Sequence, residues 1–61
     1  MILAKIPKND GEYIRKKLFK LGLVRKDDKI FENEDFIYLP LRELPDDEVI
    51  LQYGFTVENG S

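Results

Sequence analysis

The first residues of the chain carry apolar side chains at every second position. Ile2, Ala4 and Ile6 fall on one face of an extended segment, and this period of two predicts a strand over residues 2–6. Pro7 fixes its own backbone and lacks an N–H donor, so we expect the strand to end there.

The apolar period then lengthens to that of a helix over residues 10–21. Ile14, Leu18 and Leu21 recur at i, i+4 and i+7, which places them on one face. We expect this face to pack against the sheet and the opposite face to remain in solvent. Phe19 is the exception on the polar side, and we expect it to reach sideways under a neighbouring loop.

Both ends of this helix have sequence signals. Asn9 is the expected N-cap, and Glu12 three residues later completes a capping box. Gly22 stands where a helix commonly ends in a left-handed residue, with the apolar pair Leu23 and Val24 after it to pack back on the last turn.

The second half of the chain predicts a hairpin, a short helix and a last strand. Residues 29–31 and 36–41 form the hairpin strands, with a turn at residues 32–35. A Pro-Asp-Asp-Glu start suits a short helix over residues 44–51, and residues 55–58 form the closing strand.

The element order β-α-β-β-(short α)-β predicts a single small α+β domain over residues 1–61. One amphipathic helix covers one face of a three- or four-stranded, mainly antiparallel sheet. Pro40 has no donor for a ladder and is expected at a sheet edge or a strand end. The expected core consists of apolar residues on inward faces: Ile2, Ala4, Ile6, Ile14, Leu18, Leu21, Leu23, Ile30, Ile37, Leu39, Leu51 and Val57.

Composition narrows the classes of function. The 61 residues include no cysteine and no histidine, which excludes disulfides, thiolate or imidazole metal sites and catalysis by either side chain. No apolar run is long enough to cross a bilayer, so we expect no membrane partner and a cytoplasmic location. A domain of this size has little room for an enzyme active site. Binding rather than catalysis is therefore the starting assumption. A monomer with no cofactor of its own is the accompanying expectation.

Charge is divided between the two halves of the chain. Residues 1–29 carry nine Lys or Arg against four Asp or Glu, whereas residues 30–61 carry one against eight. The first half therefore has a net charge of +5 and the second of −7. Segregation of this kind gives one surface a field that attracts a polyanion, although the net charge of the whole chain is −2.

The cations of the predicted helix and of the segment after it are candidates for phosphate contacts. The alternative for Arg15, Lys16 and Lys20 is an ordinary solvated helix face. Arg25 and Lys26 either extend the same patch or pair with Asp27 and Asp28. The binding hypothesis requires that the helix cations are not neutralised by the acids of residues 43–48. Among the aromatic residues Tyr13, Phe36 and Tyr38 are candidates for stacking on RNA bases, and Tyr38 is preferred because its hydroxyl tolerates a half-wet position.

The stretch from Lys5 to Leu41 resembles the N-terminal accessory domain of archaeal tRNA (guanine-N1-)-methyltransferases, which act on the guanine 3′ of the anticodon. The matching features are a strand ending in Lys-Ile-Pro-Lys, the basic pair Arg15-Lys16, the run GLVRKDDKI from Gly22 to Ile30, and YLPL from Tyr38 to Leu41. None is diagnostic alone, and the ordered combination is moderately specific.

The resemblance implies a function for this chain. In that family the small domain contacts the outer corner of tRNA, where the D- and T-loops meet, and is joined to a catalytic domain that binds S-adenosylmethionine. The partners implied are tRNA and that catalytic domain, whose cofactor would not bind this chain. The RNA-binding residues expected here are Lys8, Arg15, Lys16, Lys20, Arg25, Lys26 and Tyr38. The alternatives are a protein-interaction module that uses the acidic half, and a structural or regulatory domain.

Overall fold

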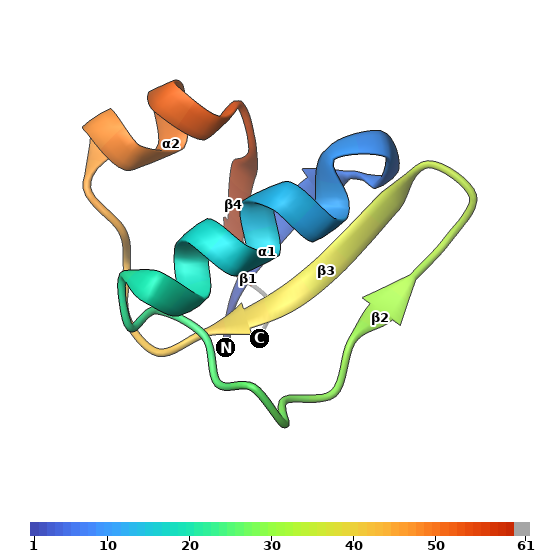
Figure 1. Ribbon diagram of the computed structural model, residues 1–61, viewed down its shortest axis with the longest axis horizontal. Helices are drawn as coiled ribbons and strands as arrows, with labels where there is room; N and C mark the ends of the chain where they lie inside the picture. Colours follow the sequence, from blue (N-terminus) through green and yellow to red (C-terminus); the bar gives the residue numbers. More distant parts are fainter. Residues whose placement is uncertain (60–61) are drawn as a thin grey trace.

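The computed structural model describes residues 1–59 and has the predicted α+β architecture, with one main helix on a four-stranded antiparallel sheet (Figure 1). The elements follow in the predicted order, with one additional 3₁₀ turn. They are β1 (Ile2–Pro7), η1 (Lys8–Asp10), α1 (Gly11–Lys20), β2 (Phe31–Glu32), β3 (Phe36–Leu41), α2 (Asp47–Tyr53) and β4 (Thr56–Asn59).

The sheet has the strand order β2-β3-β1-β4, so the first strand of the chain lies in its interior. Both neighbours of β1 are antiparallel to it, and Ala4 is paired with Leu39 on one side and Val57 on the other. Ala4 and Ile6 are fully buried beneath α1, which crosses one face of the sheet (Figure 1). The predicted alternation along β1 is thus confirmed, although the strand includes Pro7.

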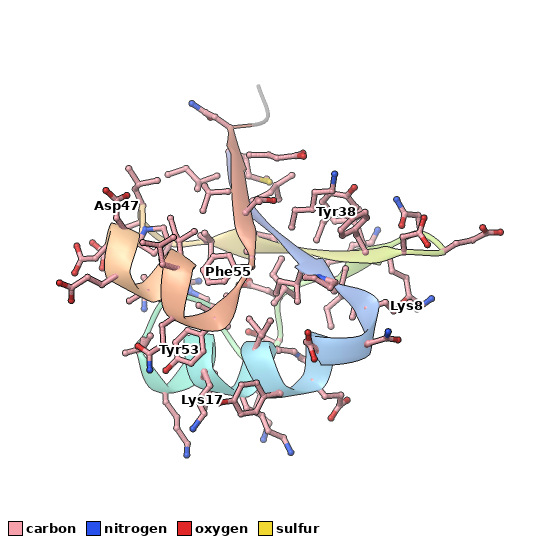
Figure 2. The ribbon with its side chains drawn as sticks, turned by 90° about the horizontal axis from the view of Figure 1, so that it is seen from above. Lys8, Lys17, Tyr38, Asp47, Tyr53 and Phe55 are labelled. Atoms are coloured by element: carbon pink, nitrogen blue, oxygen red, sulfur yellow. The ribbon has the colours of Figure 1, made fainter. Side chains whose placement is uncertain are left out.

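The core confirms most of the predicted apolar positions and corrects three. Leu21, Ile30 and Leu51 are exposed rather than buried. Three apolar residues that were not in the predicted core are buried in it: Val24, Leu41 and Phe55. Figure 2 shows Phe55 enclosed between α2 and the sheet.

The predictions for the two ends of α1 had different outcomes. The prediction of an N-cap at Asn9 was wrong, because Asn9 lies inside η1 and the N-cap is Asp10, which makes no side-chain capping bond. The C-terminal prediction is confirmed. Gly22 has φ 76°, and the N–H of Leu23 donates to the carbonyl of Leu18 at 3.0 Å, as in a Schellman motif.

The hairpin is shorter than predicted on its first strand. β2 holds only two residues, and its turn is closed by the Asn33 side chain, whose Oδ1 accepts from the N–H groups of Asp35 and Phe36 at 2.9 and 2.8 Å. Since β2 pairs with β3 only at Ile37 and Tyr38, Pro40 has no strand beside it on that edge. The predicted edge position of Pro40 is confirmed in this sense.

The short helix begins and ends later than predicted. A proline disfavours the helical conformation for the residue before it, and with Pro45 in this place the helix starts only at Asp47, after the extended N-cap Asp46. It ends at Gly54, which has φ 72°. The closing strand begins at Thr56, one residue later than expected.

Candidate nucleic-acid interface

A hollow of about 580 Å³ lies on the outer side of α1, away from the sheet. Five of the seven predicted RNA-binding residues line it together. Its lining residues are Glu12, Tyr13, Arg15, Lys16, Lys17, Phe19, Lys20, Val24, Arg25 and Lys26.

Two segments form this hollow. The first is the exposed side of α1, where Arg15, Lys16 and Phe19 are neighbours at the i+3 and i+4 spacings. The second is the chain just after the helix, which the Gly22 cap turns back so that Val24 enters the core. The same helix stop that completes the fold therefore places Arg25 and its neighbours beside the helix.

A hydrogen bond joins the two segments. Arg15 donates from Nη2 to the carbonyl oxygen of Lys26 at 3.2 Å. Within residues 1–59 neither Arg25 nor Lys26 forms an ion pair with Asp27 or Asp28. The contact of Asp28 with this segment is to the backbone, where its Oδ2 accepts from the N–H of Arg25 at 3.0 Å and closes a local turn. Between the two readings of the sequence, the structure thus favours Arg25 and Lys26 as an extension of the helix patch.

The hollow is strongly positive. Six cations and a single carboxylate, that of Glu12, lie on its lining. Within residues 1–59 the ion pairs are Lys5 with Glu58 and Lys8 with Glu32, both at 3.7 Å, and neither involves a lining residue. The requirement that the acids of residues 43–48 leave the helix cations unneutralised is therefore met in the described part of the chain.

Comparison with known protein families identifies the chain. Residues 4–50 match the family described as the tRNA methyltransferase 5 N-terminal domain. The chain belongs to this family. Searches of curated proteins and of solved structures found no match. The match to the tRNA methyltransferase 5 N-terminal domain spans the whole hollow, so the site lies within the part that defines the family.

Two predicted RNA-binding residues of this family member lie outside the hollow. Lys8 is at the hairpin turn, where its Nζ donates to the carbonyl of Asn33 at 3.2 Å and pairs with Glu32. Tyr38 lies on the sheet face opposite α1, between Phe31 and Lys5 in the strand register (Figure 2). A role for either residue in RNA binding stays a prediction, and it would require a second contact surface.

Two aromatic residues, Phe19 and Tyr13, lie on the lining of the hollow. Phe19 was expected under a loop, yet the residue is 51% exposed and lines the hollow, so that prediction was wrong. The signal that identifies it was present, since Phe19 is the apolar residue on the polar face of α1. Tyr13 is a lining residue too, and its ring meets that of Tyr53 edge-on at 6.3 Å.

Other kinds of site find no support in residues 1–59. No group of three or more Asp or Glu side chains in this part of the chain is placed to hold a metal ion. No helix among the described residues is long and apolar enough to span a membrane.

Proposed function

We propose that this chain is the tRNA-binding accessory domain of a tRNA (guanine-N1-)-methyltransferase of the archaeal type, and that it binds the outer corner of folded tRNA through the hollow on α1. The observation that carries the proposal is the convergence of Arg15, Lys16, Lys20, Arg25 and Lys26 around one concave surface without an acidic partner. Membership in the tRNA methyltransferase 5 N-terminal domain family supports tRNA as the polyanion.

The chemistry of the hollow suits a folded RNA. Proteins recognise folded RNA largely by shape, through phosphate and 2′-hydroxyl contacts, and by stacking on bases that loops expose. The corner where two loops meet presents closely spaced phosphates to a concave basic surface. A handful of phosphate contacts gives modest, salt-sensitive affinity, which is sufficient for a domain tethered to a catalytic domain that binds the same tRNA.

The remaining parts of the proposal follow from this role. The chain would supply tRNA recognition and no methyl transfer, and S-adenosylmethionine would bind the catalytic domain. That domain is the second proposed partner. A monomeric state and a cytoplasmic location stay predictions.

Charge reversal on α1 tests the proposal. We expect Lys16→Glu with Lys20→Glu to weaken tRNA binding by at least tenfold at 0.15 M salt, because two phosphate contacts become repulsions. Arg15 is left in place, since its guanidinium holds Lys26. The matched control is Lys29→Glu, which changes an exposed lysine outside the hollow and should alter the dissociation constant by less than the corresponding single change at Lys16.

Intact and elbow-disrupted tRNA distinguish corner recognition from general attraction. Binding that survives at 50 mM salt and is lost by 300 mM, and that weakens when the D- and T-loop contact is disrupted, would support the proposal. Equal binding to both RNAs would reject the corner. No binding to folded tRNA at any salt concentration would reject the tRNA function.

A second hollow favours the protein-interaction alternative. It has a volume of about 230 Å³ and lies between the end of α1 and the start of α2, where the exposed Leu21 and Leu44 adjoin Glu43 and Asp46. Apolar side chains beside carboxylates suit a basic amphipathic segment of another protein. This function is supported if the chain binds a basic amphipathic peptide and fails to bind tRNA, and if Leu44→Asp abolishes the peptide binding.

A further inference from the structure

Phe19 occupies an unusual place for a phenylalanine. The residue is 51% exposed, on the one face of α1 that does not touch the sheet. Arg15 and Lys16 lie one turn before it, and Lys20 follows it. An exposed ring among cations contributes little to folding, because its apolar area is removed from water only in part.

Three other exposed or half-buried aromatic rings each have a lysine ammonium against them. Lys17 lies over Tyr13 at 5.4 Å, Lys29 over Phe31 at 5.5 Å, and Lys5 over Phe36 at 4.3 Å from ammonium to ring centroid. Phe19 has neither a cation nor another ring against it within residues 1–59. Its ring face is therefore available to a ligand.

The lining of the hollow combines two kinds of surface. A ligand made of phosphate groups alone would bind to the cations but would make no favourable contact with the apolar side chains of Phe19, Tyr13 and Val24. An apolar ligand alone would have to cover six cations and remove them from water, which is costly. A nucleotide matches both kinds of surface, because its base has an apolar π-face and its flanking phosphates are anionic.

We propose that Phe19 is a stacking platform for one outward-facing base of the bound RNA, while the cations around it hold the flanking phosphates. This inference rests on the proposed function and adds the chemical class that the hollow accepts. A hollow of about 580 Å³ is large enough to receive one base against the ring. Stacking on Phe19 makes binding depend on a ring as well as on charge.

Removal of the ring is the first test. Phe19→Ala should weaken binding of the 61-residue chain to tRNA by about 5- to 150-fold, the range for loss of one base–aromatic stack. The slope of affinity against salt concentration should not change, since no phosphate contact is removed. The matched control is Phe31→Ala, because Phe31 is 49% exposed, also lies near a lysine, and is outside the hollow.

Two further substitutions separate stacking from simple apolar contact. Phe19→Leu keeps apolar volume without a planar ring and should bind as poorly as Phe19→Ala. Phe19→Trp keeps the ring and should restore affinity. The chain has no tryptophan, so residue 19 would carry the single indole, and its fluorescence should be quenched in a saturable manner as tRNA is added. Circular dichroism should show the same fold for all variants, since this side chain lies outside the core.

Each outcome has one reading. Weak binding by the alanine and leucine variants, with quenching of the indole, supports the stacking platform. Normal binding by Phe19→Ala, combined with loss of binding when Lys16 and Lys20 are reversed, overturns the platform and leaves the tRNA function in place. Full affinity in Phe19→Leu also overturns it, because apolar contact alone would then suffice. If reversal of the lysines has no effect, the proposed function itself fails.

Discussion

The two helices of this domain end in the same way but hold very different positions. A left-handed glycine follows each of them: Gly22, with φ 76°, comes two residues after the end of α1, and Gly54, with φ 72°, directly after α2. Between its ends α1 buries Ile14 and Leu18 almost completely, whereas no residue of α2 is buried. The same local stop signal therefore serves a helix that organises the core and one that only covers it.

Their charges are opposite as well, and each helix has its charges at the favourable end of its dipole. Asp47 and Glu48 lie in the first turn of α2, and Lys17 and Lys20 in the last turn of α1. The dipole gives no reason for Lys16 in the middle of α1. One face of α1 therefore supports the fold while the opposite face is free to bind a ligand. α2 contributes less than α1 to the core and less to the binding surface.

The largest expected difference between the helices is in stability. Leu18→Ala in α1 should lower the free energy of unfolding by about 2–5 kcal/mol, because Leu18 is fully buried and its loss leaves a cavity. The same change in α2, Leu51→Ala, should cost less than about 0.5 kcal/mol, because Leu51 is 81% exposed. Urea unfolding followed by circular dichroism measures both. Equal losses would mean that Leu51 is buried in solution, against its exposed place on α2.

The sequence predicted this fold wherever a local period or a stop signal decides the structure. Alternation specified β1 and the inward face of β3, and the helical period with Gly22 specified α1. The errors fall where the orientation of a side chain depends on elements distant in sequence. Leu21 continues the apolar face of α1 by spacing, but it follows the last helical residue and no other element covers it.

The candidate site was predictable in its charges and not in its shape. The three helix cations were expected to share a surface, whereas Arg25 and Lys26 were expected either to extend it or to pair with Asp27 and Asp28. The structure places all five on the lining of one hollow, since a helix and the loop after it cannot separate far. The positions of Lys8 and Tyr38 depend on the hairpin and on which face of the sheet the helix covers, and a single sequence does not fix either one. Phe19 was placed under a loop because burial is the usual state of phenylalanine.

A smaller effect should appear at the two glycine stops. Gly22→Ala and Gly54→Ala should each destabilise the domain by about 1 kcal/mol, since an L-residue is strained in the left-handed region and open space surrounds both positions. Thermal unfolding compares the two variants directly. A much larger loss for Gly22→Ala would show that the Schellman turn, which carries Leu23 and Val24 into the core, stabilises more than its own backbone.

The smallest expected effect concerns the acids of α2. Asp47→Lys with Glu48→Lys should raise tRNA affinity by no more than about threefold at 0.15 M salt, because neither acid lines the hollow on α1 and charges beyond about 8 Å are screened at that salt. The gain should vanish at 300 mM salt, and Asp47→Asn with Glu48→Gln should give a smaller gain. A tenfold gain would place RNA against α2 and enlarge the interface. A loss of tRNA binding with an intact fold would contradict the division of roles between the two helices, because replacing anions by cations cannot weaken a purely electrostatic attraction to RNA.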